Sequence, residues 1–224
     1  MYSDYLDTEY GEKMNNKQRF ETLAYMGEPH TWYPQARNMP RKIIMHVGPT
    51  NSGKTHNAFQ RLLEAKSGYY LAPLRLLAAE GYTRMKEKGK KVSLVTGDYR
   101  IEEDGATHQA STVEMCNISE QVEVVVLDEI QMIGDESRGW AWTRALLGVC
   151  APEIHLCGEE RSIELVKQLC ELTGDEVEVN TYNRLTELQV DQDHLGPNFV
   201  DKLEKGDCIV AFSRRELYNL KNLI

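Results

Sequence analysis

The chain has 224 residues, 41% of them hydrophobic, and its 26 Lys and Arg against 35 Asp and Glu give a formal net charge of −9. This is the composition of an ordinary globular protein, long enough for one full domain and part of a second, and the acidic total alone disfavours a polyanion as partner. The longest apolar runs, 124–127 and 145–151, are far shorter than the roughly 18–20 residues of a membrane-spanning helix, which excludes a transmembrane protein. We expect no membrane partner.

The N-terminal lead-in, residues 1–39, carries little that predicts function. Its first twelve residues hold four acidic and no basic side chains, whereas targeting peptides are basic or apolar, so we expect no targeting signal in this chain. One helix is predicted at Asn16–Met26. Basic residues nevertheless outnumber acidic ones by 16 to 10 in residues 1–100, which leaves a local basic surface compatible with the acidic total.

From Lys42 onward, short apolar runs alternate with longer helical patterns. This alternation is typical of βα units around a mostly parallel sheet, and therefore predicts an α/β fold. The predicted strands are Lys42–Val47, Gly68–Ala72, Val92–Thr96, Val122–Leu127 and Glu153–Cys157. The predicted helices are Lys54–Ala65, Leu74–Lys88, Arg138–Val149 and Arg161–Leu172, the last ending at Gly174.

A second α/β unit is predicted at the C-terminus. Glu176–Val190 alternates apolar and polar residues and is predicted to be extended, and Gly196-Pro197 then breaks the pattern. Cys208–Phe212 is a candidate buried strand, followed by a helix that Ser213 and Glu216 would cap. We therefore expect a first domain at 40–181, a linker at 182–195, and the truncated start of a second domain at 196–224.

Residues 48–55 read GPTNSGKT and match the phosphate-binding pattern GxxxxGK[ST], between a predicted strand and a predicted helix. Glycines let the backbone N–H groups curl around phosphates, and the start of the helix adds its positive end. Lys54 would neutralise the β and γ phosphates, and Thr55 would bind Mg²⁺. The predicted nucleotide-binding residues are Gly48, Pro49, Thr50, Asn51, Ser52, Gly53, Lys54 and Thr55.

Two carboxylates follow the apolar strand that ends at Leu127, where α/β sheets place ligand-binding groups. Asp128 would hold Mg²⁺ together with Thr55, and Glu129 would position and deprotonate an attacking water. ATP and Mg²⁺ are therefore the expected cofactors. The combination predicts transfer or hydrolysis of a nucleoside triphosphate γ-phosphate.

Further runs occur in a fixed order along the chain: APLRLLAAE (72–80), LVTGD (94–98), STVEM (111–115), DEIQ (128–131), RGWAWTR (138–144) and HLCGE (155–159). Together with GPTNSGKT they resemble the ordered motifs of superfamily 2 helicases. More narrowly, GPTNSGKT, DEIQM and RGWAWTRALLG resemble the mitochondrial degradosome-type ATP-dependent RNA helicases of the Suv family, over about residues 30–224. The resemblance implies one complete RecA-like domain followed by the truncated start of a second.

The same resemblance implies roles for individual residues. Gln131 would join Lys54, Asp128 and Glu129 in the catalytic set and connect the Mg²⁺ site to the second domain. Gly158 and Glu159 would couple hydrolysis to movement along RNA. The implied RNA contacts are Arg75, Thr96, Gly97, Ser111 and Thr112.

The resemblance also implies partners and a location. The nucleic acid would be single-stranded or partly duplex RNA, with DNA as the alternative, and the protein partner would be an exoribonuclease. Location would be mitochondrial, or cytoplasmic for bacterial relatives. Because superfamily 2 enzymes take arginine fingers from the second domain, we expect this chain to bind nucleotide but to hydrolyse ATP and unwind RNA poorly.

Two tryptophans in the helix predicted at Arg138–Val149 admit two interpretations. If exposed, Trp140 and Trp142 would be available to stack on bases. Next to Ala145 and Leu146, they also fit a helix face that packs in the core. We favour core packing for both.

Two other functions stay open. Nucleoside kinases of the thymidine-kinase type also combine a GPxxSGK[ST] loop with a DExQ strand end, but they resemble one another in carrying paired CxxC motifs in a zinc ribbon. The five cysteines here form no CxxC pair, so we expect reduced thiols and no zinc. The remaining alternative is a nucleotide-binding module without enzymatic activity.

Overall fold

A computed structural model describes residues 28–187, 189–190, 195–196 and 198–224. The helix predicted at Asn16–Met26 lies outside these residues. The chain divides into two compact units, Met1–Leu185 and Thr186–Ile224, which are described separately. Within the described ranges, no helix is both long enough and apolar enough to cross a membrane.

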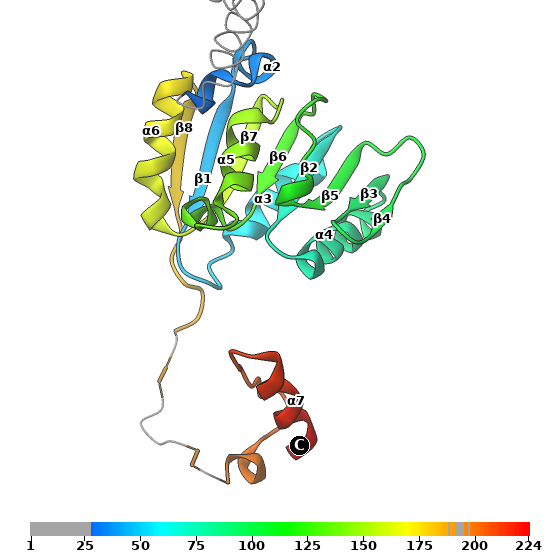
Figure 1. The fold of residues 1–224 in the computed structure, drawn as a ribbon, viewed down its shortest axis with the longest axis vertical. Coiled ribbons are helices and arrows are strands. Elements are labelled where there is room, and N and C mark those ends of the chain that lie inside the picture. The colour runs from blue at the N-terminus through cyan, green and yellow to red at the C-terminus, as the bar shows by residue number, and fades with distance from the viewer. Residues whose placement is uncertain (1–27, 188, 191–194, 197) are drawn as a thin grey trace, which may run out of the picture. The chain divides into compact units, whose positions relative to one another are not determined.

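The first unit is built on an eight-stranded sheet with strand order β4-β3-β5-β2-β6-β7-β1-β8 (Figure 1). Every neighbouring pair is parallel except β3 and β4, which confirms the mostly parallel α/β fold. The central strands β2 and β6 are buried along their whole length, as strands covered on both faces must be. The strands are β1 (Lys42–Val47), β2 (Gly68–Ala72), β3 (Val92–Val95), β4 (Arg100–Ile101), β5 (His108–Thr112), β6 (Val124–Leu127), β7 (Glu153–Gly158) and β8 (Glu176–Thr181).

Helices cover the two faces of the sheet with separate hydrophobic clusters (Figure 1). On one face, α3 (Lys54–Glu64) and α4 (Arg75–Glu87) contribute apolar side chains to the cluster around Phe59. On the other face, α5 (Gly139–Gly148) and α6 (Ile163–Thr173) pack around Trp142. The remaining helices are η1 (Pro29–Thr31), α2 (Pro34–Arg37), η2 (Val113–Met115), η3 (Ile130–Gly134), η4 (Glu160–Ser162), η5 (Phe199–Lys202) and α7 (Arg214–Leu223).

Most predicted elements of the first unit are confirmed, with bounds that agree to within two residues. Gly174 ends α6 in the left-handed conformation, with a φ of 72°, as predicted. Two strands, β4 and β5, were not predicted. The sequence of β5, HQAST, carries no apolar run, yet the strand lies between β2 and β3 and is mostly buried. Its position in the sheet, rather than its hydrophobicity, makes it a strand.

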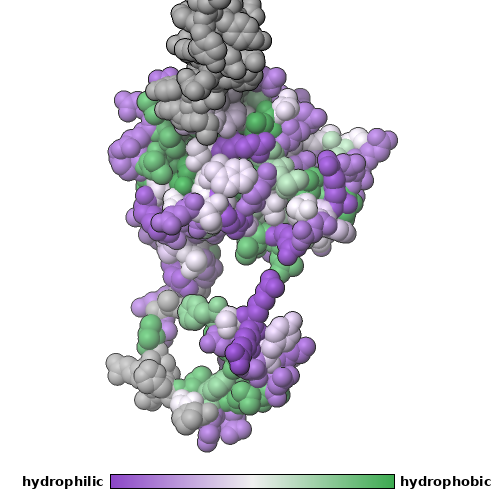
Figure 2. Space-filling model, viewed as in Figure 1, coloured by the Kyte–Doolittle hydropathy of each residue, from purple (hydrophilic) through white to green (hydrophobic). Residues whose placement is uncertain are grey.

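The predicted strand at Cys208–Phe212 is wrong. This segment has no regular structure, and the residues Val210 and Phe212 are 77% and 101% exposed. A strand needs a paired neighbour, and none of the described residues pairs with this segment. Figure 2 shows hydrophobic residues on the surface of the C-terminal unit. The Ser213 half of the predicted cap is confirmed, because the Glu216 backbone N–H donates to the Ser213 hydroxyl over 3.1 Å at the start of α7.

The two tryptophans of α5 differ. Trp142 is fully buried, which confirms core packing for that residue, whereas Trp140 is 57% exposed and the same prediction is wrong for it. Residues two positions apart on a helix point to opposite sides, so a helix with one buried face can bury only one of these two side chains.

Gly81 provides a test of packing between α4 and the sheet. An added Cβ would lie 2.3 Å from Cδ1 of Tyr70, a buried side chain whose hydroxyl is held by Asp128. Replacing a helical glycine by alanine normally stabilises by about 1 kcal/mol. Here we expect Gly81→Ala to lower the free energy of unfolding by about 1–2 kcal/mol, because overpacking outweighs helix propensity.

Urea denaturation measures this change. On the same helix, the exposed Thr83→Ala is the matched control, with an expected change below about 0.5 kcal/mol. A stabilised Gly81→Ala would contradict the packing described here.

Candidate active site

The loop between β1 and α3 has the backbone of a phosphate-binding loop. Gly53 precedes α3 with a φ of 83°, and Asn51 has a φ of 56°, so two left-handed residues curl the loop. The Gly48 N–H donates to the Gly158 carbonyl over 3.1 Å. A Cβ at Gly48 would lie 2.4 Å from the Tyr182 carbonyl oxygen, so this position accepts only glycine.

Two side chains of the loop are arranged for an anion. Lys54 is buried, and its Nζ donates to the Pro49 carbonyl over 3.0 Å, which holds the ammonium against the loop at the start of α3. Among the described residues, the buried Ser52 hydroxyl has no hydrogen-bond partner. A buried donor without a partner is costly, and a phosphate oxygen would satisfy it.

Asp128 lies at the end of β6 with its carboxylate buried. Thr55 donates to one carboxylate oxygen over 3.3 Å, and Tyr70 donates to the other over 3.0 Å. Burial, followed by the charge of Glu129, raises the pKa of Asp128. Mg²⁺ prefers oxygen ligands, which this carboxylate and the neighbouring Thr55 hydroxyl would provide. The positive charge of Mg²⁺ would in turn stabilise the charged form of the carboxylate.

Gln131 joins the Asp-Glu motif to the end of β7. Its amide nitrogen donates to Glu129 Oε2, and its Oε1 accepts from the Glu159 N–H over 3.2 Å. A Cβ at Gly158 would lie 2.4 Å from that Oε1, so glycine is needed there for the approach. Glu129 itself has a φ of 52°, an unfavourable value that persists at functional sites. The structure thus joins Glu129, through Gln131, to the predicted coupling residues Gly158 and Glu159.

A groove of about 390 Å³ lies beside this site and is called the Arg75 groove. It contains three of the five predicted RNA contacts. Arg75 forms an ion pair with Asp98 on the exposed surface there. The lining residues are Pro73, Leu74, Arg75, Gly97, Asp98, Thr112, Glu114, Met115 and Arg138.

The other two predicted contacts do not line the groove. The Thr96 hydroxyl donates to the Tyr99 carbonyl over 3.0 Å and accepts from the Tyr99 N–H over 3.1 Å, so it closes its own turn. Ser111 is fully buried at 0% exposure. Sequence reasoning missed Arg138 as a lining residue, although it begins the RGWAWTR run.

A buried hydrogen-bonded chain under the loop was also missed. His46 Nδ1 lies 2.8 Å from the Tyr182 hydroxyl, and His46 Nε2 lies 2.8 Å from His155 Nδ1. His155 Nε2 then contacts Glu153 over 2.7 Å. Burial, followed by the His155 charge, lowers the pKa of His46 to about 4. No spacing in the sequence predicts these hydrogen bonds, because they join residues of β1 and β7 to Tyr182, which follows β8.

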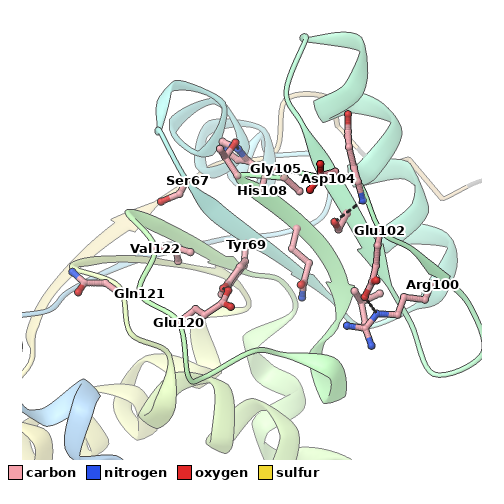
Figure 3. A pocket seen from close by; sticks show the side chains of 16 residues that line it. Ser67, Tyr69, Arg100, Glu102, Asp104, Gly105, His108, Glu120, Gln121 and Val122 are labelled. Carbon is pink, nitrogen blue, oxygen red and sulfur yellow. Dashed lines mark hydrogen bonds and ion pairs between the residues drawn. The ribbon is translucent and has the colours of Figure 1, made fainter.

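A larger hollow, of about 690 Å³, lies near the amino ends of β2 and β5 (Figure 3). Tyr69 and Glu120 line it on one side, with Arg100 and Glu102 on the other. It contains none of the predicted site residues. The parallel strands therefore place the predicted chemistry at their carboxyl ends, away from this hollow.

The model of a known family, the DEXQ-box helicase domain of Suv3, matches residues 29–182. The chain belongs to this family. It is 54% identical over 200 residues to the mitochondrial ATP-dependent RNA helicase SUPV3L1 of Mus musculus, and 49% identical over 206 residues to the SUV3 homolog of Drosophila melanogaster. These matches cover 88% and 90% of the chain but only 25% and 27% of the relatives. The chain therefore spans about a quarter of their length.

A solved structure shows the same fold. The chain superimposes on a hypothetical ATP-dependent RNA helicase from Sulfolobus tokodaii with a TM-score of 0.51 and 16% identity, over 74% of this chain and 56% of that one. At this identity the likeness concerns the fold alone. It confirms the expected RecA-like helicase fold for this Suv3-family domain.

The buried histidines make stability depend on pH. Because the pKa of His46 is about 4 in the folded chain against 6.5 for a free histidine, the unfolded state takes up the proton first as pH falls. The stabilisation is complete above about pH 6.5 and is lost towards pH 4. Between about pH 7 and pH 4.5, we expect wild type to lose about 2 kcal/mol more unfolding free energy than His46→Gln.

Chemical denaturation at the two pH values measures the difference. His56→Gln, at an exposed position of α3, is the control and should follow wild type. Equal losses in wild type and His46→Gln would show that His46 is not held in its neutral form.

Proposed function

We propose that this chain provides the ATP-binding domain of an ATP-dependent RNA helicase that acts in RNA turnover. The observation that carries this proposal is the meeting of two motifs: Thr55 of the phosphate loop donates to Asp128 of the DEIQ motif, 73 residues away. The Arg75 groove lies at the same edge of the sheet. Nucleotide and nucleic acid would therefore bind side by side on one domain.

The residues of the loop would bind the triphosphate of ATP. Lys54 and the N–H groups around Gly53 would bind the β and γ phosphates, and Thr55 and Asp128 would hold Mg²⁺. Mg²⁺ bound there would neutralise charge that develops on the phosphate oxygens. Glu129 would orient the attacking water and accept its proton, and Gln131 holds the Glu129 carboxylate in place.

Single-stranded or partly duplex RNA is the proposed nucleic acid, with DNA as the alternative. In the Arg75 groove, a guanidinium, the Gly97 backbone and the Thr112 hydroxyl offer donors to phosphates. Such contacts position a strand without reading its sequence, and they are compatible with an acidic chain. Thr96 and Ser111 would support these segments. Coupling to hydrolysis would pass from Gln131 to Gly158 and Glu159.

The chain would hold one complete RecA-like domain. We assign residues 40–181 to it, 182–195 to a linker and 196–224 to the start of a second domain. In a complete helicase that second domain would supply an arginine finger, which contributes about 10³–10⁵ in rate. The relatives are named mitochondrial, which supports a mitochondrial location for the whole protein; an exoribonuclease partner is proposed from the family resemblance.

Binding and turnover in the same samples test this proposal. We expect Lys54→Ala to weaken nucleotide binding about 10- to 100-fold, because a charged hydrogen-bonding group is lost. Glu129→Gln should bind nucleotide with an affinity close to wild type, while turnover falls by about 10²–10⁴. Fluorescent nucleotide titration, titration with labelled single-stranded RNA and phosphate release are the measurements.

Lys88→Ala, at an exposed lysine after α4, is the matched control and should behave as wild type. Thymidine is included as a competing phosphate acceptor. Unchanged nucleotide affinity in Lys54→Ala would refute the loop assignment, and phosphorylated thymidine would show a nucleoside kinase instead.

A further inference from the structure

Arg138 lies between the Arg75 groove and the nucleotide site. Its Nε donates to Glu114 over 2.8 Å, and its terminal nitrogen donates to the Pro73 carbonyl over 2.6 Å. Its guanidinium also lies 5.3 Å from the ring centre of Trp142. One side chain therefore contacts three separate segments of the domain.

Two of these segments form the walls of the Arg75 groove. Pro73 follows β2 and immediately precedes Leu74 and Arg75. Glu114 lies in η2, which begins directly after Thr112. Because the same guanidinium bonds to both, any change in the separation of the two walls must move Arg138 or break one of its bonds.

The third contact leads to the Mg²⁺-binding aspartate. Trp142 is one turn along α5 from Arg138, is fully buried, and donates from Nε1 to the Asp128 carbonyl over 2.9 Å. A buried indole cannot shift without moving the groups packed around it. Arg138 and Trp142 thus form a continuous connection from the groove walls to the backbone of Asp128.

We propose that Arg138 is a positioning residue that couples occupancy of the Arg75 groove to the nucleotide site within this single domain. The inference rests on the proposed function, since it takes RNA as the occupant of the groove. A strand bound beside Arg75 alters the spacing of Pro73 and Glu114, Arg138 follows, and Trp142 carries the shift to Asp128. This route is separate from the one through Gln131 and Glu159.

The chemistry of the contact favours arginine. A guanidinium is planar and has several N–H donors, so it can form two hydrogen bonds in different directions while its flat face lies against an indole. A lysine ammonium provides only a single charged point. Coupling between two sites is reciprocal, so each ligand changes the affinity of the other by the same factor. That factor is what the experiment measures.

The experiment compares dissociation constants of a non-hydrolysable ATP analogue with Mg²⁺, with and without a single-stranded oligouridine. It uses wild type, Arg138→Gln, Arg138→Lys and Glu114→Gln, each checked by thermal unfolding. Arg144→Gln is the matched control: Arg144 lies on the same helix and donates to the Cys116 carbonyl at the end of η2 over 3.1 Å, but does not line the groove.

In wild type, RNA should tighten binding of the analogue by a factor between about 5 and 150. We expect the factor to fall below about twofold in Arg138→Gln, Arg138→Lys and Glu114→Gln, and to be retained in Arg144→Gln. The same change must appear in the affinity for RNA measured with and without the analogue.

Three results would overturn the inference. The first is that RNA tightens binding of the analogue as much in Arg138→Gln as in wild type. The second is that Arg144→Gln loses this effect as fully as Arg138→Gln does. The third is that wild type binds RNA but its affinity for the analogue does not change. If Arg138 only contacted RNA directly, RNA affinity would fall equally with and without nucleotide and the factor would be unchanged, which is the first of these results. Absence of RNA binding in wild type would instead refute the proposed function itself, and the inference with it.

Discussion

The buried carboxyl group of Asp128 is the constraint on which the rest of the site depends. A carboxylate removed from water is costly unless donors surround it, and here the donors come from α3, from β2 and from its own following residue. The backbone carbonyl of the same residue accepts from Trp142 of α5. Helices α3 and α5, on opposite faces of the sheet, are therefore both hydrogen-bonded to Asp128. The phosphate loop, which leads into α3, is held in place with them.

The parallel sheet explains why residues far apart in the sequence meet there. The phosphate loop follows β1, Arg75 follows β2, and Gly97 follows β3, while Thr112 and Gly158 end β5 and β7. These strands are parallel, so their carboxyl ends lie at one edge of the sheet, where α/β folds bind ligands. The nucleotide site and the Arg75 groove are neighbours because of topology, before any side chain is considered.

The sequence could predict what depends on local pattern. The apolar run at β6 is sufficient to predict the strand found there, and the glycines of the phosphate loop predict a curled backbone, which the left-handed Gly53 provides. It could not predict β5, whose polar sequence is buried only because of the neighbouring strands. The buried strand predicted for the apolar segment that ends at Phe212 is wrong, because Phe212 is exposed. Hydrophobicity predicts burial only where the fold supplies a partner surface.

The site residues show the same limit. Lys54, Thr55, Asp128 and Glu129 follow from a motif whose chemistry fixes the spacing. Arg138 and His46 act through contacts with segments distant in the chain, and no spacing in the sequence indicates those contacts. Trp140 differs from expectation because burial on a helix depends on which side faces the sheet, whereas Ser111 is buried because it lies within the sheet itself. Motifs therefore locate the chemistry, and the packed structure shows how its parts are held together.

In the proposed function, nucleotide, Mg²⁺ and fold meet at Asp128, and the Mg²⁺ dependence of nucleotide binding tests this most directly. Calorimetric titration of an ATP analogue, with and without Mg²⁺, is to be compared between wild type and Asp128→Asn. We expect Mg²⁺ to tighten binding in wild type and to have little effect in Asp128→Asn, because the neutral amide is a poor ligand for a hard cation. An equal effect of Mg²⁺ in both proteins would contradict the account.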